Sequence, residues 1–185
     1  MDRALLVGPP MNAIDLLKQQ HKKTKAALEK GAEGKLDSKE AKKAADELVA
    51  HMVIEEHVFY PRIRQLMKDM VGESFEEHTV ARFALARCLT ARGEEQVKAR
   101  FTVLKELIEH HVKEEEEEMF PKVKKAIDAG ELERLGERMQ AMFEKAAAMG
   151  LDALVTGATQ ELQSPTSNGK ANGNGKAERS EARAR

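Results

Sequence analysis

The chain has 185 residues, of which 34% are charged and 4% aromatic, and its formal net charge is -1. This length indicates one domain with a core large enough to fold alone, and the balanced charge gives no reason to expect nucleic acid or an anionic membrane as a partner. No apolar run approaches the roughly 20 residues of a membrane-spanning helix, and the run near the N-terminus is too short for a signal peptide. We therefore expect a cytoplasmic protein.

The abundance of Leu, Ala, Met, Glu and Lys favours helices. Residues 1–10 form an N-terminal extension that ends in two prolines, so the first helix is expected from about residue 11 to Lys30. Two glycines within residues 31–34 predict a loop after it. The second helix is expected to begin at Asp37 or Ser38.

The later helices follow from capping patterns and glycines. Gly72 is expected to end the second helix, and the third is expected over 74–93, because Ser74 followed by Glu77 is a capping-box pattern. The fourth helix is expected over 94–128. The spacing within each half fits a helix, a short connection and a second helix that runs back beside the first.

Beyond Gly130, apolar residues at helical spacing predict a C-terminal amphipathic helix over residues 131–155. We expect it to dock on the bundle, with dimerisation or a cover over a site as alternatives. Its methionines favour adaptable packing over a copper site, because no His or Cys accompanies them. Residues 156–185 are expected to form a disordered polar tail, rich in Ser, Asn, Gly, Lys and Arg from about Ser164.

A motif of a histidine, a glutamate four residues later, and then an aromatic residue and a proline occurs in the second and fourth helices. Its copies are His51-x-x-x-Glu55 with Tyr60-Pro61 and His111-x-x-x-Glu115 with Phe120-Pro121. Residues four apart lie on one helix face, so each copy points an imidazole and a carboxylate the same way. The prolines are expected to kink or tighten the helix, or only to mark its end.

A further histidine precedes each copy by about thirty residues, His21 in the first helix and His78 in the third. All six polar residues stand in apolar seams where leucines are expected. A lone seam histidine is more often a hydrogen-bonded core residue than a ligand, but a repeat of six such positions favours metal. A buried, unpaired carboxylate costs several kcal/mol, so two of them imply a cation.

Other polar residues are expected to have lesser roles. His57 and His110 are turned off the seams and should be surface or outer groups, and the acidic run 114–118 and Glu56 should form solvated faces. Glu118 could orient a ligand. Tyr60 should be packing, or a hydrogen bond near bound oxygen species. Cys88 should be a core or flanking residue, with a redox role as the alternative.

Four imidazoles and two carboxylates make a mixed nitrogen and oxygen ligand set, which suits iron, manganese or zinc better than calcium or magnesium. Six protein ligands are too many for one tetrahedral zinc ion. Two ions that share carboxylates use the set better, as other helical bundles do.

The pattern of His21, His51-x-x-x-Glu55, His78 and His111-x-x-x-Glu115 resembles the hemerythrin-like, or HHE cation-binding, domain over roughly residues 10 to 130. The resemblance implies an all-α, up-and-down four-helix bundle over residues 11–130, which holds two non-haem iron ions, with an oxo or hydroxo bridge between them. It also implies histidines as terminal ligands and glutamates that bridge or cap the irons. Manganese and zinc remain alternatives.

One position departs from the family. Oxygen-carrying hemerythrins have a fifth histidine one turn from that of the third helix, but here Ser74 and Arg82 stand there. A ligand set with one fewer imidazole makes an open or water-filled position more plausible than simple oxygen carriage.

Three functions are therefore considered. The first is a di-iron protein that binds or senses dioxygen, peroxide or iron; the second is a di-iron oxidoreductase that consumes peroxide, like a catalase, or nitric oxide; the third is a metal-stabilised or metal-free helical interaction module. The expected small-molecule partners are dioxygen, peroxide or nitric oxide, and the expected state is a monomer or a weak homodimer.

Overall fold

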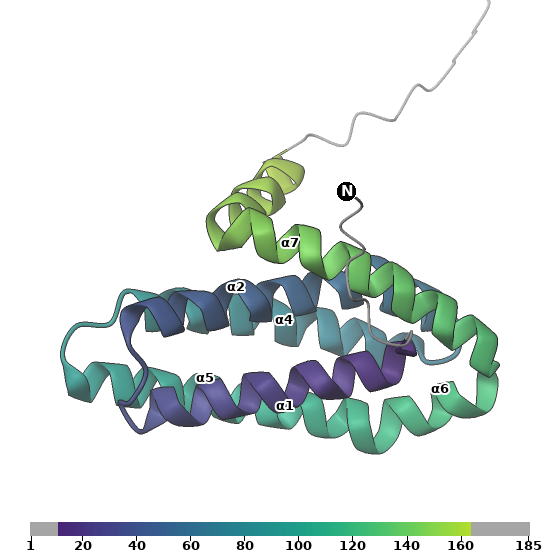
Figure 1. The fold of residues 1–185 in the computed structure, drawn as a ribbon, viewed down its shortest axis with the longest axis horizontal. Coiled ribbons are helices and arrows are strands. Elements are labelled where there is room, and N and C mark those ends of the chain that lie inside the picture. The colour runs from purple at the N-terminus through teal and green to yellow at the C-terminus, as the bar shows by residue number, and fades with distance from the viewer. Residues whose placement is uncertain (1–10, 164–185) are drawn as a thin grey trace, which may run out of the picture.

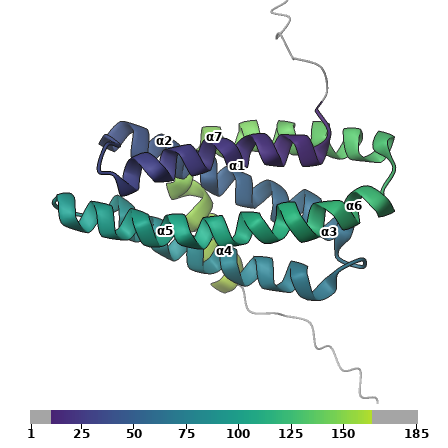
Figure 2. The ribbon, with the colours of Figure 1, turned by 90° about the horizontal axis from the view of Figure 1, so that it is seen from below.

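The computed structural model describes residues 11–163, and the regular elements in this range are helices. Four long helices make up the bundle: α1 (Ala13–Ala32), α2 (Ser38–Ile54), α4 (Lys68–Leu89) and α5 (Glu94–Glu114). They lie side by side in up-and-down order (Figure 1), and the view from below shows the same arrangement (Figure 2). The all-α bundle predicted from the sequence is confirmed.

The first two helices begin at side-chain caps. The Asn12 side chain accepts a hydrogen bond from the backbone N–H of Asp15 at the start of α1. Asp37 and Glu40 form a reciprocal capping box at the start of α2, which confirms the predicted boundary. Both caps satisfy backbone donors that the first turn of a helix leaves free.

The predicted boundary between the second and third helices is wrong. Gly72 lies inside α4, which begins at Lys68, and Ser74 is a mid-helix residue whose hydroxyl donates to the carbonyl of Met70. A side chain added at Gly72 would point into open space, while Val71 beside it is buried in the core. Burial of that valine outweighs the roughly 1 kcal/mol by which glycine weakens a helix.

Both motif helices widen into a π-helical turn at the motif glutamate. These turns are η1 (Glu55–Phe59) and η2 (Glu115–Met119), and they lead into α3 (Tyr60–Ile63) and α6 (Phe120–Ala126). The N–H of Tyr60 bonds the carbonyl of Glu55, five residues back. Pro61 lacks an N–H and its ring would clash with a carbonyl four residues back, so the wider turn relieves the strain. The prolines thus widen the helix rather than tighten it.

The C-terminal helix α7 (Ala129–Gln163) packs along α1 and α2, as Figure 1 shows. It begins one residue before Gly130, which the sequence placed as a stop, and its helical backbone extends past residue 155 to Gln163. Gly150 interrupts it with a left-handed φ of 75°, so the helix changes direction there. The predicted docking of this helix on the bundle is therefore observed.

Two apolar clusters form the core. One cluster joins the start of α1, the proline ends of the motif helices and α7. The other lies toward the opposite end of the bundle, around Leu48 of α2, Leu85 of α4 and Leu104 of α5. Within residues 11–163, no helix has both the length and the apolar character needed to cross a membrane. The N-terminal extension 1–10 and the tail from residue 164 lie outside the described residues.

Candidate metal centre

The six residues singled out by the repeat meet in one layer between the two apolar clusters. Each of them is at most 4% exposed: His21, His51, Glu55, His78, His111 and Glu115. They come from α1, α2 with η1, α4 and α5 with η2. The up-and-down order therefore brings one histidine from each bundle helix to the same level.

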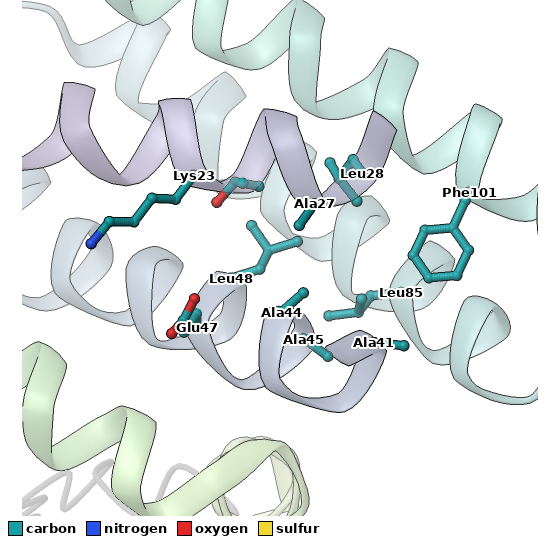
Figure 3. Close-up of a pocket in the computed structure, with 11 residues that line it drawn as sticks. Lys23, Ala27, Leu28, Ala41, Ala44, Ala45, Glu47, Leu48, Leu85 and Phe101 are labelled. Atoms are coloured by element: carbon teal, nitrogen blue, oxygen red, sulfur yellow. The ribbon is translucent and has the colours of Figure 1, made fainter. Parts of the chain in front are cut away.

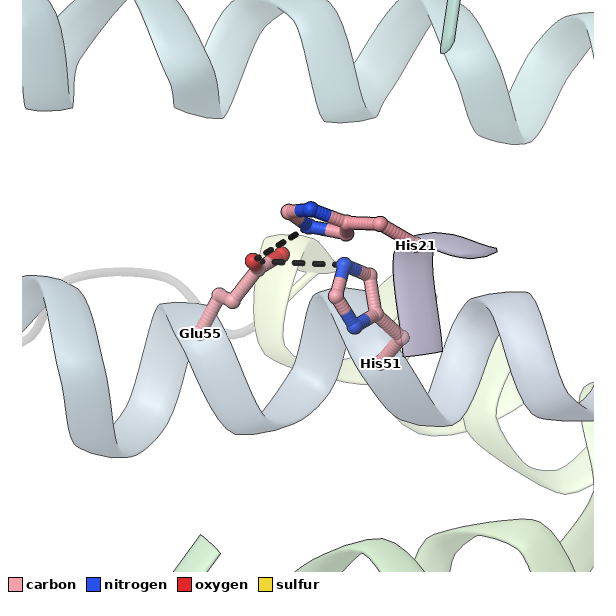
Figure 4. A group of neighbouring side chains, drawn as sticks. All are labelled: His21, His51 and Glu55. Carbon is pink, nitrogen blue, oxygen red and sulfur yellow. Dashed lines mark ion pairs between the residues drawn. The ribbon is translucent and has the colours of Figure 1, made fainter. Parts of the chain in front are cut away.

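One group of ligand atoms is formed by α1 and α2 (Figure 4). Glu55 Oε1 lies 3.2 Å from His51 Nε2 and 3.9 Å from His21 Nε2. The imidazole and carboxylate of the motif thus point in the same direction, as expected for residues four apart on a helix.

A second group lies on the other side of the same carboxylate. Glu55 Oε2 is 3.4 Å from His78 Nε2, and His78 Nε2 is 3.1 Å from His111 Nε2. The two groups therefore share Glu55, with one oxygen directed toward each. This is the arrangement of a carboxylate that can bridge two ions.

Glu115 also lies between the groups. Its Oε2 is 3.2 Å from His21 Nε2 and 3.7 Å from His111 Nε2. Its other oxygen, Oε1, accepts a hydrogen bond of 2.9 Å from the hydroxyl of Tyr60. Both glutamates thus lie between the two groups. Among the described residues, both oxygens of Glu55 lack a hydrogen-bond partner, whereas only one oxygen of Glu115 does.

Each histidine is oriented by an acceptor at its other ring nitrogen. The Nδ1 atoms lie 2.7 to 2.9 Å from side-chain oxygens, in the pairs His21 with Glu116, His51 with Gln20, His78 with Glu56, and His111 with Glu77. A carboxylate or an amide oxygen can only accept, so Nδ1 carries the proton. In the neutral ring, Nε2 then presents its lone pair to the centre, as metal-binding histidines do.

Several buried atoms in the centre have no hydrogen-bond partner among the described residues. They are His21 Nε2, both carboxylate oxygens of Glu55, and Oε2 of Glu115. A buried polar atom without a partner costs about 1–3 kcal/mol, and a charged one more. All of these atoms are good ligands for a cation of the iron, manganese or zinc type, so the residues fit a metal.

Without a metal, protons balance the charges. Burial opposes a charge on His21 and His78, but the neighbouring carboxylates raise their pKa values to about 10 and about 9. Burial lowers the pKa of His51 to about 3, so this ring stays neutral. Glu55 remains ionised because the surrounding histidines hold its pKa well below the usual value despite its burial. The carboxylates of the centre therefore favour the binding of positive charge, either protons or a metal cation.

Tyr60 occupies the region where the sequence lacks a fifth histidine. Its ring is fully buried, and its hydroxyl lies 3.5 Å from His78 Nε2 as well as on Glu115. Ser74 is buried beside it, while Arg82 binds the Glu56 carboxylate at 2.7 Å. Tyr60 packs in the core as predicted, and its hydroxyl also donates to a candidate ligand; a hydrogen bond near a bound oxygen species stays a prediction.

Several other residues lie where the sequence placed them. His57, His110 and Glu118 lie on the surface as expected, and Glu118 contacts Lys122 rather than a ligand. Cys88 is buried in the core.

The interpretation of Glu56 and Glu116 as parts of solvated faces is wrong, because both orient ligand histidines. They come from a helix neighbouring that of the ring they bind, so a pattern within one helix could not reveal the contact.

Sequence reasoning also missed Gln20 and Glu77, each of which directly precedes a ligand histidine. Their shared place in the repeat was the available signal, since both stand one residue before the first histidine of a half. Each binds the ring of the motif histidine on another helix. In each half, the residue before the first candidate ligand histidine therefore orients the ring of the second.

Comparison with known proteins agrees with this geometry. The family model for the hemerythrin HHE cation-binding domain matches residues 12–123. The uncharacterized proteins Rv2633c of Mycobacterium tuberculosis and Mb2666c of Mycobacterium bovis are each 28% identical over 157 residues, which cover 82% of this chain and 98% of theirs. No solved structure matches significantly. The chain belongs to the hemerythrin HHE cation-binding domain family.

Proposed function

We propose that this chain binds two iron ions in the bundle and uses them to bind dioxygen or peroxide. The observation that supports this most is the convergence of buried ring nitrogens and carboxylates in one layer. Within residues 11–163, His21 Nε2, both oxygens of Glu55 and Oε2 of Glu115 have no hydrogen-bond partner there. In a helical module without a metal, only protons taken up by histidines such as His21 and His78 would balance the buried carboxylates.

Two overlapping sets of residues would hold the ions. His21, His51 and Glu55 would hold one, and His78, His111 and Glu55 the other, with Glu115 between them. Manganese or zinc would accept the same donors, but iron, when bound, supplies the redox chemistry that dioxygen and peroxide require. The six side chains leave part of the coordination of two such ions unfilled, since iron commonly takes six ligands.

The surrounding residues would protect and position a small ligand. The apolar clusters on both sides keep bulk water from the layer. Burial and the nearby Glu115 carboxylate raise the pKa of Tyr60 well above its usual value, so its hydroxyl remains a donor. The hydroxyl lies beside His78, and if its single proton left Glu115 Oε1 it could be donated to an oxygen of a bound small molecule.

This donor favours a second candidate function, an oxidoreductase that consumes peroxide or nitric oxide. A hydroxyl beside the reacting group can stabilise negative charge that develops on oxygen. The binder and the enzyme would share the same metal centre and differ only in turnover.

The test is elemental analysis of the purified full-length protein, together with its visible absorption before and after reduction and re-exposure to air. We expect about two irons per chain and absorption bands that reduction removes. No metal, or colourless zinc alone, would contradict the proposal. Adding peroxide while following dioxygen release then separates enzyme from binder, because only turnover releases dioxygen continuously.

A further inference from the structure

Two small cavities lie next to each other along the seam between α1 and α2. The inner cavity is lined by all four candidate ligand histidines and by apolar residues such as Met52, Ile108 and Val112. Its lining is apolar, so it borders carbon atoms of the rings, next to the nitrogens that face the centre. Its room is roughly that of one water molecule.

The outer cavity begins at the protein surface. Figure 3 shows it between α1 and α2, with Lys23 at one end and Phe101 at the other. Alanines form much of its wall, including Ala27, Ala41 and Ala44, which are all half-buried. These small side chains leave a gap between the two helices that larger ones would fill.

Thr24 and Leu48 line both cavities. Thr24 lies one turn after His21 on α1, and Leu48 lies one turn before His51 on α2. Leu48 is 2% exposed, whereas Thr24 is half-buried. These two side chains thus separate the surface cavity from the one beside the histidines.

The other half of the same seam is covered. There α7 packs on α1 and α2, and Leu135 and Met139 join Ile14 and Leu17 in the apolar cluster. The helix changes direction at Gly150, next to Asp46 of α2. The straight part of α7 therefore extends along α2 as far as Asp46, and the outer cavity opens where Lys23 and Glu47 line it.

We propose that an uncharged molecule of two heavy atoms, such as nitric oxide or dioxygen, reaches the metal centre through this seam, and that Leu48 and Thr24 form the gate. Among the described residues that line the outer cavity, the charged ones are Lys23 and Glu47 at the rim, whose charges are opposite. The histidines that line the inner cavity would be neutral when they bind metal. Such a passage gives no attraction to an anion, and its width excludes organic molecules. The choice of ligand rests on the proposed function, whereas the route itself does not.

The route can be tested without iron chemistry by dissolving xenon in the full-length, zinc-loaded protein and following its methyl NMR signals. We expect xenon-dependent shifts at Leu28, Leu48 and Leu85, and their loss in Ala44→Leu, which fills the outer cavity. Ala26→Leu is the matched control, because Ala26 is an exposed α1 residue outside the cavity. Absence of these shifts, or identical shifts in Ala44→Leu, would overturn the proposal.

The second test measures nitric oxide binding to the reduced, iron-loaded protein by stopped flow. Ala44→Leu should slow association and dissociation by the same factor, roughly tenfold, since a route affects passage and not the bound state. Leu48→Ala should speed both, and Ala26→Leu should change neither. Wild-type rates in both Ala44→Leu and Leu48→Ala would overturn the route.

The two proposals fail in different ways. A wild-type protein that holds no iron contradicts the proposed function, and one that holds iron but takes up no nitric oxide contradicts the choice of that ligand; in both cases the xenon result still decides the route. Normal uptake with no effect of Ala44→Leu contradicts the route alone.

Discussion

The two halves of the bundle place equivalent ligands but surround them differently. His21, His51 and Glu55 correspond in the repeat to His78, His111 and Glu115. The outer contacts of the first histidines also correspond, because Glu116 binds His21 and Glu56 binds His78. The halves are therefore related by an approximate twofold exchange.

Two pairs break this exchange. Gln20 binds His51 through a neutral amide, whereas its counterpart Glu77 binds His111 through a carboxylate.

The aromatic residues before the prolines also differ. Phe120 stacks on His21 with ring centroids 5.9 Å apart, whereas its counterpart Tyr60 lies 5.6 Å from His78 and donates to Glu115. The extra charge and the extra hydroxyl are thus on the same side of the centre. The repeated residues build the candidate ligand set, and the unrepeated ones would make the two proposed metal positions inequivalent.

The largest expected effect comes from removing the shared carboxylate. Glu55→Ala should lose both ions and much of the thermal stability, because one oxygen of Glu55 faces each group and the remaining buried ligands lose their balancing charge. Glu115→Ala should lose less metal, because Tyr60 already engages one of its oxygens. Metal analysis and melting curves measure both, with exposed Glu118→Ala as control. Equal losses in the two variants would contradict the distinction.

The titration of His21 and His51 should make the metal-free protein most stable near pH 6.5. The pKa of His21 is raised to about 10, so its stabilising contribution is complete below 6.5 and is lost as pH rises toward 10. The pKa of His51 is lowered to about 3, so its contribution is lost as pH falls from 6.5 toward 3. Calorimetry of the chelator-treated chain measures this, and a melting temperature that rises steadily up to pH 10 would contradict it.

Exchanging the outer acceptors should change metal affinity in opposite directions. Glu77→Gln removes the charge behind His111 and should weaken binding at that position by roughly 10–100-fold. Gln20→Glu places a charge behind His51 and should strengthen the first position. Chelator competition measures the two affinities. If both substitutions act alike, the asymmetry is not set by these acceptors.

The smallest effect is expected for Tyr60→Phe, which makes the second half resemble the first. Glu115 Oε1 loses its donor, which should lower the stability of the metal-free protein by about 1–3 kcal/mol. Bound metal should relieve this, because the freed oxygen becomes a ligand. Denaturant unfolding with and without metal measures both values, and Phe120→Leu serves as a packing control. A loss as large with metal as without it would rule out this explanation.

The sequence predicted the candidate ligands because the repeat places each of them at the same point of an apolar seam. The sequence could not locate the helix ends with the same success. At Gly72, burial of Val71 outweighs the local preference of glycine. The π-helical turns at Glu55 and Glu115 respond to prolines five residues or more away, an effect that simple helical periodicity does not contain.

The outer acceptors required knowledge of which helices are neighbours. Glu116 looks like one member of a solvated acidic run, and only the packing of α1 against α5 brings it to His21. A charge pattern along one helix carries no information about a ring on another. The ligand set was therefore predictable from the sequence, whereas its asymmetry was not.

The most direct test of the shared-carboxylate centre is the iron content of the full-length protein after anaerobic loading, measured for the wild type and for Glu55→Ala. We predict about two irons per chain in the wild type and none in the variant. A wild type that binds one ion or none, or a Glu55→Ala variant that keeps its iron, would contradict the account.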